Sequence, residues 1–460
     1  MKLKFVSMLF VVLVLGACGK LDPAPEQSAG LKVATQVASF QGIGDIAGSG
    51  SYALAVSGDG ATVVGYSKSG PLNEPFRWTQ AGGMESLGDL PGGTTSGVAY
   101  DVSANGSFIV GQSDSSDGPE AFLWSQGNGM VGLGDLPGGL YSSAATGVSA
   151  DGSVIVGRGF TTEGVEAFRW TQGYLGMVGL SDLPRGDTES SAQAVSADGT
   201  VTVGTGNSQF GREAARWYHG LTTAPLIGLG DFPGGVFESV AFAVSDDGTV
   251  IAGYGKTAIG QTAFRWTKAG GMEALNAHVA FGASADGSTI VGTAYFGASL
   301  RAMIWDEMNG VRNLKTLLEN YGLDLAGWTL HRASDVSSDG SVIVGWGINP
   351  AGDLEAWRAE VPPLNTPPVA DAGSNYAGTV GVPTHLDGSA SFDADGDALS
   401  YSWSVNSPSC TLSNALTAKP SVTCNTAGDY AVMLTVTDEH ALSDDDAAEL
   451  TVIKVKKPKR

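Results

Sequence analysis

Three alternating aspartates, Asp393, Asp395 and Asp397, have a type and spacing that could bind a metal ion. Alternating carboxylates can surround Ca²⁺, which takes six to eight oxygen ligands. A complete twelve-residue calcium loop is absent, because Ser404 stands where such a loop requires glutamate. The same spacing also suits a turn in which Asp side chains accept backbone N–H bonds. Both interpretations stay open, and the sequence requires no cofactor beyond this possible structural Ca²⁺.

Five further residues are ligand-binding candidates because they cluster where the sequence is least regular. An enzyme needs such an asymmetric set, but residues 35–362 contain no Cys, no closely spaced His pair and no phosphate-binding glycine loop. Paired carboxylates for glycoside cleavage are not excluded. We therefore expect a non-enzymatic protein, and irregular connections between strands would equally explain the cluster. The five residues are His278, Tyr295, Arg301, His331 and Arg332.

The N-terminus predicts export and lipidation. A short basic start precedes an apolar run, Phe5 to Leu15, which is too short to span a bilayer as a stable helix. The following Leu-Gly-Ala-Cys resembles the lipobox of bacterial lipoproteins, which implies that residues 1–17 are removed and that Cys18 carries acyl chains. An ordinary secretory signal with a chance cysteine is the alternative. Residues 18–34 are expected to be a flexible tether.

Export also decides what the remaining cysteines and the net charge mean. In an oxidising compartment, Cys410 and Cys424 are expected to form a disulfide, with free thiols as the alternative. The net charge of −22 repels nucleic acid and anionic lipid surfaces. We expect a monomer in the bacterial cell envelope that binds a protein or carbohydrate ligand. Its acyl anchor is expected to hold it to the bilayer. Gly19 after the cysteine favours the outer membrane.

A repeated phrase organises most of the chain. Seven copies of Ser-x-Asp/Asn-Gly recur at intervals of 39 to 53 residues, each followed by a tryptophan 17 or 18 residues after its glycine. Such a period with β-type content is typical of propellers and related arrays. The repeat residues that we expect to be structural are Asp59, Gly60, Trp78, Asp89, Trp124, Asp135, Trp170, Trp217, Trp266, Trp305 and Trp357.

Each repeat predicts four short antiparallel strands, with Asp-Gly as the first hairpin. A lone strand-like segment before the first copy matches the fourth strand that the last copy lacks. The sequence therefore predicts an all-β fold: a seven-bladed β-propeller over residues 35–362, closed by the N-terminal strand. An open solenoid and an eight-bladed ring are the alternatives. Residues 311–322 carry leucines at helical spacing, which predicts one short amphipathic helix.

These repeats resemble the HAF family of extracellular repeats. The motifs that carry the resemblance are Gly-Asp-Leu-Pro-Gly-Gly, Val-Ser-Ala-Asp-Gly-Ser-Val-Ile-Val-Gly and Glu-Ala-Phe-Arg-Trp-Thr, and they extend from Gly42 to about Pro362. The family implies a bacterial surface or secreted protein, but it implies no chemistry for any single residue.

The C-terminal region has a sequence pattern that differs from that of the repeats. Residues 363–368 are expected to be a stiff linker, and residues 456–460 a basic, solvated tail. Between them, residues 369–455 resemble a PKD domain, an Ig-like β-sandwich, in the segments Leu386-Asp-Gly-Ser, Tyr401-Ser-Trp and Gly428-Asp-Tyr. The resemblance implies an extracellular module and places Trp403 in its core.

Carboxylates recur in every regular repeat and could form a binding face for a cation or a basic partner. Because one ligand needs one set of groups, we expect instead that they hold each repeat's own turns. The sequence thus favours a non-enzymatic binding, adhesion or scaffold lipoprotein. A polysaccharide or peptide hydrolase, and a scaffold facing the periplasm, are the alternatives. The recurring carboxylates are Asp45, Asp89, Asp135, Asp182, Asp231, Glu74, Glu120, Glu166, Glu213 and Glu355.

Overall fold

The computed structural model describes residues 37–455, except 174–175, 181, 185, 187–188, 220–225, 363–366, 394–396 and 440. The expected signal segment, Cys18, the tether, most of the linker, Asp395 and the basic tail all lie outside the described residues. No helix in the described part of the chain is long and apolar enough to cross a membrane.

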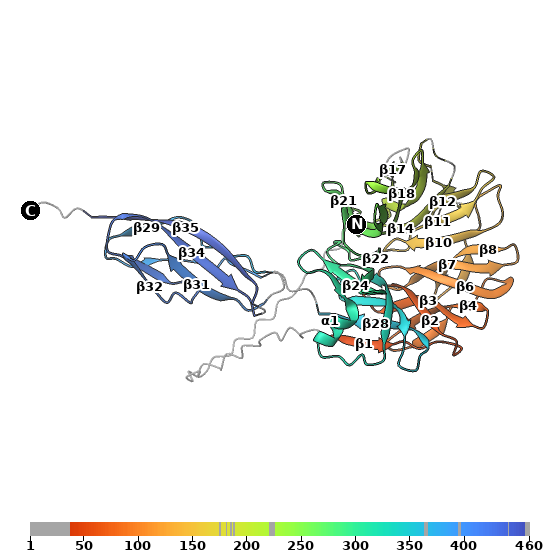
Figure 1. Ribbon diagram of the computed structural model, residues 1–460, viewed down its shortest axis with the longest axis horizontal. Helices are drawn as coiled ribbons and strands as arrows, with labels where there is room; N and C mark the ends of the chain where they lie inside the picture. Colours follow the sequence, from red (N-terminus) through yellow and green to blue (C-terminus); the bar gives the residue numbers. More distant parts are fainter. Residues whose placement is uncertain are drawn as a thin grey trace, which may run out of the picture. The chain divides into compact units, whose positions relative to one another are not determined.

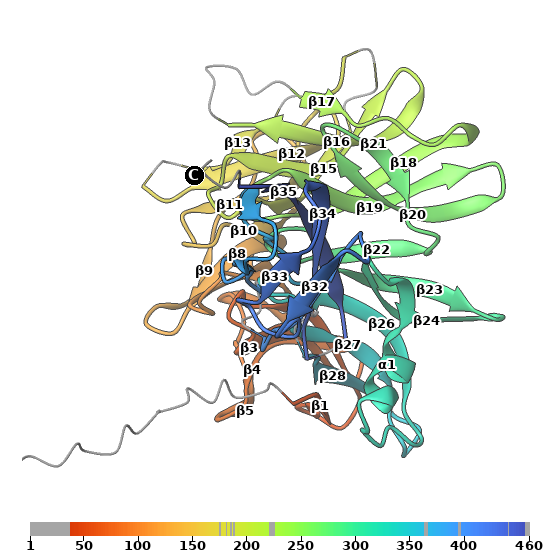
Figure 2. The same ribbon diagram turned by 90° about the vertical axis from the view of Figure 1, so that its left-hand side faces the viewer.

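The all-β prediction is confirmed. Each repeat forms a four-stranded antiparallel sheet, and the sheets follow one another in chain order (Figures 1 and 2). The first three sheets consist of β2 (Ser51–Val56), β3 (Thr62–Ser69), β4 (Leu72–Thr79) and β5 (Gly83–Ser86); β6 (Gly92–Val102), β7 (Phe108–Ser115), β8 (Pro119–Ser125) and β9 (Gly129–Gly132); and β10 (Ser143–Val148), β11 (Val154–Phe160), β12 (Val165–Thr171) and β13 (Val178–Gly179).

The next three sheets follow the same order of strands. They consist of β14 (Ser190–Val195), β15 (Val201–Ser208), β16 (Gly211–Tyr218) and β17 (Leu226–Gly228); β18 (Gly234–Val244), β19 (Val250–Thr257), β20 (Gly260–Thr267) and β21 (Gly271–Ala274); and β22 (Val279–Ala283), β23 (Ile290–Phe296), β24 (Ser299–Asp306) and β25 (Gly310–Asn313). A single parallel bridge between Arg212 and Glu238 joins the fourth sheet to the fifth.

The seventh sheet takes its fourth strand from the beginning of the chain. It comprises β26 (Thr329–Val336), β27 (Val342–Ile348), β28 (Leu354–Glu360) and β1 (Ser39–Gly42). β1 pairs antiparallel with β28, with Phe40 opposite Ala359. The predicted lone N-terminal strand therefore completes the last repeat.

The small residues of the repeat allow the strands to pack closely. Gly65 in β3 illustrates the constraint, because a Cβ at this position would lie 1.9 Å from the carbonyl oxygen of Tyr52. Phenylalanines of the third strands, such as Phe76 and Phe122, are fully buried between neighbouring sheets. The first and seventh sheets share a core in which Val56 and Val63 pack with Val344.

The Ser-x-Asp-Gly phrase forms a hydrogen-bonded turn. In the first repeat, the Oγ of Ser57 donates to Asp59 (2.5 Å) and accepts from the N–H of Thr62 (2.9 Å). Asp59 also accepts from the N–H of Ala61 at 3.0 Å, and Gly60 takes a positive φ of 69°. The same serine-to-carboxylate or serine-to-amide bond occurs in the other six repeats. These residues therefore build the hairpin.

The residue that directly follows each of these serines takes part in a series of backbone hydrogen bonds, which we call the axial backbone ring. From the second repeat onward, each N–H donates to the equivalent carbonyl of the next repeat, at 2.9–3.2 Å, and Ser338 donates to Gly58 of the first repeat at 3.0 Å. The N–H of Asp59 then donates to Ala104 at 3.1 Å. The ring residues are Gly58, Ala104, Ala150, Ala197, Asp246, Ala285 and Ser338.

The one helix among the described elements is α1 (Leu314–Asn320), and it agrees with the predicted amphipathic segment. Asn313 caps it by accepting a hydrogen bond from the N–H of Thr316. Leu314 and Leu318 are buried in the core of the sixth and seventh sheets, next to Trp357.

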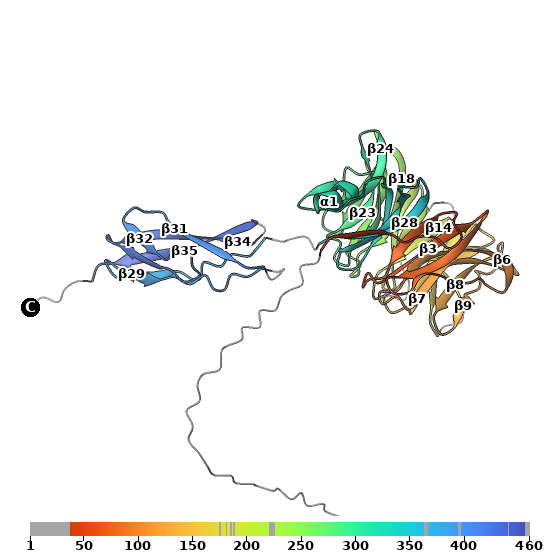
Figure 3. The same cartoon turned by 90° about the horizontal axis from the view of Figure 1, so that it is seen from below.

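The C-terminal domain has two layers, seen from the side in Figure 3, and their strands are antiparallel except that β29 pairs parallel with β35. A disulfide joins Cys410 to Cys424 between two paired strands, and Trp403 is buried in the core. One layer consists of β29 (Tyr376–Thr379), β35 (Ser443–Ile453), β34 (Gly428–Thr437) and β31 (Ser400–Val405), and the other of β30 (Thr384–His385), β33 (Ser421–Cys424) and β32 (Cys410–Ser413).

Candidate functional site: an axial pocket

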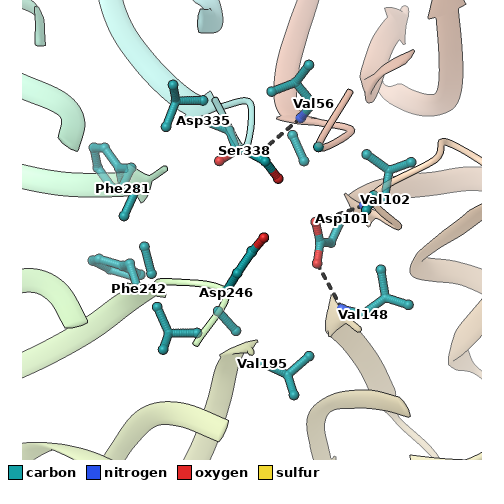
Figure 4. Close-up of a pocket in the computed structure, with 18 of the residues that line it drawn as sticks. Val56, Asp101, Val102, Val148, Val195, Phe242, Asp246, Phe281, Asp335 and Ser338 are labelled. Carbon is teal, nitrogen blue, oxygen red and sulfur yellow. Dashed lines mark hydrogen bonds between the residues drawn. The ribbon is translucent and has the colours of Figure 1, made fainter. Parts of the chain in front are cut away.

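The first strands of all seven repeat sheets surround one pocket of about 190 Å³ (Figure 4). Every one of these strands changes register between the fourth and second residues before the Ser of the turn, and β6, β18 and β26 have a second shift nearer their start. Such a bulge re-aims a side chain. The seven bulge residues all line the pocket: Leu54, Tyr100, Thr146, Gln193, Phe242, Phe281 and Ser334.

The bulge residues differ in size and polarity from repeat to repeat, and phenylalanine is the one type that occurs twice among them. The residue before each bulge is always alanine, from Ala53 in the first repeat to Ala333 in the seventh. The repeat is thus uniform where it packs and variable where it faces the axis. A ligand that approaches along the axis would meet an asymmetric surface.

The residue after the bulge is alanine or glycine in five repeats and aspartate in two, Asp101 and Asp335. Each aspartate bonds to the next repeat: Asp101 accepts from the N–H of Val148 at 2.8 Å, and Asp335 accepts from that of Val56 at 3.0 Å. Gly282 leaves room for Asp335, since a Cβ there would lie 2.8 Å from its Oδ1.

Burial changes the protonation of both carboxyl groups. Burial and the charge of Asp335 raise the pKa of Asp101 to about 7, against the lowering effect of the backbone N–H groups of Val148 and Val102. Burial likewise raises the pKa of Asp335 to about 7. Two carboxyl groups that titrate near neutrality in one pocket are a feature of functional sites.

One end of the pocket lies at the axial backbone ring. Asp246 and Ser338 are the two ring residues with polar side chains, and both line the pocket. Burial raises the pKa of Asp246, and a hydrogen bond from the Ser338 side chain opposes this shift. Figure 4 shows Asp101 and Asp246 pointing into the pocket from opposite sides.

Aromatic side chains form two groups of ring contacts, and the pair Phe242 and Phe281 belongs to the pocket lining. Tyr52 stacks on Tyr66 with ring centroids 4.7 Å apart, and Trp346 meets Tyr52 edge-on at 5.1 Å. Phe242 and Phe281, which line the pocket, lie 5.4 Å apart. We call these five residues the aromatic cluster. Flat apolar faces of this kind suit carbohydrate rings and protein side chains.

Two of the five sequence-predicted ligand residues adjoin this cluster. The ring of His331 lies 5.4 Å from that of Trp346, and the guanidinium of Arg332 lies 3.4 Å from the centre of the Phe281 ring. Burial lowers the pKa of Arg332 to about 10, and burial together with the charge of Arg301 lowers the pKa of His331.

The other predicted residues lie in the sixth sheet and its preceding loop. His278 and Tyr295 meet edge-on at 5.2 Å, and burial lowers the pKa of His278. Arg301 donates to the carbonyl of Leu300 at 2.7 Å. None of these three residues lines the axial pocket.

The predicted calcium site has a third member that the sequence did not indicate. Three carboxylate oxygens, one from each of Asp393, Asp397 and Asp438, lie within 4.8 Å of one another. Asp395 is outside the described residues. All-carboxylate donors fit a hard cation such as Ca²⁺. Asp438 stands far from the other two in sequence, so no spacing could have identified it.

The recurring carboxylates bind backbone groups. Glu120, Glu213 and Glu355 each accept a hydrogen bond from a glycine N–H at 2.9–3.0 Å, and Asp135 accepts from the N–H groups of Leu136 and Ser142 at 2.8 Å. Asp89 is exposed. The repeated tryptophans pack between sheets: Trp78, Trp217, Trp266 and Trp357 are buried, and Trp124, Trp170 and Trp305 are partly buried.

Sequence reasoning missed Asp101, Asp335, Asp246 and Ser334. The signal was available, because aligning the seven repeats on their Ser-x-Asp-Gly phrases places these residues in columns otherwise filled by small or uncharged residues.

Comparison with known proteins identifies the C-terminal region. Residues 365–452 match the family described as PKD domain. The solution structure of the PKD domain from the KIAA 1837 protein is 33% identical and covers 20% of this chain and 91% of that chain, with a TM-score of 0.18. No curated protein matches the chain.

Larger solved structures resemble the chain only distantly. Oligogalacturonate lyase from Vibrio parahaemolyticus is 9% identical, covering 71% of this chain and 98% of that chain at a TM-score of 0.48. TolB from Acinetobacter baumannii is 13% identical, covering 56% of this chain and 66% of that chain at a TM-score of 0.41.

Proposed function

Because residues 365–452 belong to the PKD domain family, we propose that this chain is a non-enzymatic binding protein of the bacterial cell envelope. Its ligand, a protein or a carbohydrate, binds along the axis of the repeat domain at the aromatic cluster. The observation that carries this proposal is the contrast between the alanine that precedes every bulge and the six residue types found among the seven bulge residues at the axis.

We also propose that the repeats are HAF-type blades of a closed seven-bladed propeller. The axial backbone ring supports closure, because Ser338 of the last repeat bonds to Gly58 of the first at 3.0 Å. The pairing of β1 with β28 supports it independently at the outer edge of the last sheet. A closed ring has no exposed sheet edge there, which favours a rigid and soluble scaffold.

Binding is tested by screening the full chain, purified in detergent, on glycan arrays and in pull-downs from envelope extracts. We expect a ligand whose affinity falls at least tenfold in Trp346→Ala, because truncation removes a large stacking face. The matched control is Phe210→Ala, an exposed aromatic away from the pocket lining. Equal losses in both variants, or none, would contradict axial binding.

A hydrolase is the second candidate, because Asp101 and Asp335 both titrate near neutrality in one pocket. Glycoside cleavage uses two carboxyl groups of which one stays protonated. Assays on polysaccharides and peptides decide between the candidates. Turnover that disappears in Asp335→Ala would replace the binding proposal with this one.

The anchor and the orientation are further parts of the proposal. The Leu-Gly-Ala-Cys segment supports acylation at Cys18, and Gly19 supports the outer membrane. Labelled palmitate should enter the wild-type protein but not Cys18→Ser. Protease treatment of intact cells separates surface display from a scaffold facing the periplasm, since only a surface protein is cleaved.

A further inference from the structure

The axial pocket contains oxygen donors that packing of the repeat does not require. Three carboxylates line it, those of Asp101, Asp246 and Asp335, and the equivalent positions of most other repeats carry alanine or glycine. Since the scaffold forms without these carboxylates in the other repeats, their presence needs another explanation.

No basic side chain is among the described residues that line this pocket. The guanidinium of Arg332 lies over the ring of Phe281, which lines the pocket. Carboxylates that share a buried site without a counter-charge repel one another, as the effect of Asp335 on Asp101 shows. A bound cation would remove this repulsion.

Ser334 gives an independent sign of a ligand. Its side chain is only 3% exposed and lines the pocket, and within the described structure its Oγ has no hydrogen-bond partner. A buried hydroxyl without a partner costs about 1–3 kcal/mol. Ser334 directly precedes Asp335, so one ligand can contact both side chains.

We propose that the axial pocket binds a hydrated divalent cation, Mg²⁺ or Ca²⁺, through Asp101, Asp335 and the Oγ of Ser334. All the donors are oxygens, which hard cations prefer. Among the described residues, three carboxylates within 4.8 Å of one another occur only at Asp393, Asp397 and Asp438. The three axial carboxylates therefore do not all meet at one bare ion, and water completes the shell in a pocket of about 190 Å³.

This inference names a first ligand for the pocket and so rests on its proposed binding function. Isothermal titration of CaCl₂ and MgCl₂ into the metal-free full chain tests it. The cluster at Asp393 could also bind Ca²⁺, so the background is Asp438→Asn, which keeps an acceptor for the N–H of Leu442. In that background we expect one cation per chain.

The decisive variant is Asp101→Ala combined with Asp335→Ala. Alanine occupies the equivalent position in three other repeats, at Ala55, Ala194 and Ala243, so the backbone tolerates it. We expect affinity for the cation to fall at least tenfold, and about threefold in Ser334→Ala. The matched control, Asp89→Ala with Asp117→Ala, makes the same charge change at exposed positions.

Fluorescence adds a reading that is local to the pocket. Tb³⁺ in place of Ca²⁺ should emit by energy transfer from Tyr100, which lines the pocket, and lose part of this emission in Tyr100→Phe. Unchanged binding in the double alanine variant, no binding in the Asp438→Asn background, or binding of spermidine but of neither metal would each overturn the cation site. Glycan and protein ligands are screened separately, so the broader binding proposal can survive such a result.

Discussion

At the scale of single residues, the aspartates of the turns and the two buried aspartates at the axis differ in their pKa values. Turn aspartates such as Asp151 and Asp198 accept hydrogen bonds from a serine and a backbone N–H, which lower their pKa. Asp101 and Asp335 show the opposite shift, because burial outweighs their backbone bonds. The pKa shift therefore has opposite directions in these turn aspartates and in the two aspartates at the axis.

The raised pKa values make stability depend on pH. The carboxyl groups of Asp101 and Asp335 hold protons up to about pH 7 when folded but only to about pH 4 when unfolded. The stability that protonation contributes is thus complete below pH 4 and is lost as the pH rises to 7. For the metal-free chain we expect each of these two carboxyl groups to lower the free energy of unfolding by up to about 4 kcal/mol between pH 4 and 8.

Urea unfolding of the wild type and of the double alanine variant at several pH values measures this effect. All other titrating groups cancel in the difference between the two proteins. The difference should grow in favour of the variant as the pH rises. A difference that stays constant from pH 4 to 8 would show that the two carboxyl groups titrate normally.

We expect the serine of each turn to contribute to the free energy of unfolding through its hydrogen bonds. In Ser57→Ala, the buried N–H of Thr62 loses its acceptor and the exposed carboxylate of Asp59 loses a donor. We expect a loss of about 1–3 kcal/mol in the free energy of unfolding, measured with urea. Ser69→Ala at an exposed position is the control, and an equal effect in both would contradict the role of the turn.

At the scale of elements, the sequence predicted what recurs and missed what departs from the pattern. The four strands of a repeat, the Asp-Gly hairpins and helix α1 follow from local periodicity and turn chemistry. Asp101 and Asp335 were hidden because each reads as an ordinary residue within its own strand. The bulge that turns the preceding side chain to the axis is a property of strand pairing, which local patterns do not encode.

The contribution of β1 can be measured through one side chain. Phe40 packs edge-on against Trp328 with ring centroids 5.1 Å apart, and against Trp357 at 6.1 Å. Phe40→Ala should cost about 2–3 kcal/mol, because it removes a half-buried aromatic that ties the start of the chain to the last sheet. Thermal unfolding of Val37→Ala, at a position 78% exposed, gives the baseline. A midpoint unchanged by Phe40→Ala would count against β1 as part of the last sheet.

At the scale of the whole molecule, the chain joins two domains with different sources of stability. The repeat domain depends on cores shared between neighbouring sheets, so a local defect affects several repeats. The PKD domain is far smaller and adds the Cys410–Cys424 disulfide to its own core. Small exported domains commonly need such a covalent link.

Reduction should therefore affect only one of two unfolding transitions. The disulfide spans 14 residues, and closing a loop of this size stabilises a fold by about 3 kcal/mol through the unfolded chain. In calorimetry of the full chain, Cys410→Ser with Cys424→Ser should lower the midpoint of the smaller transition, by about 10 °C or more, and leave the larger one unchanged. Adding reductant to the wild type should reproduce this result and have no effect on the variant. If both transitions shift together, the domains unfold as one unit and the disulfide supports the whole chain.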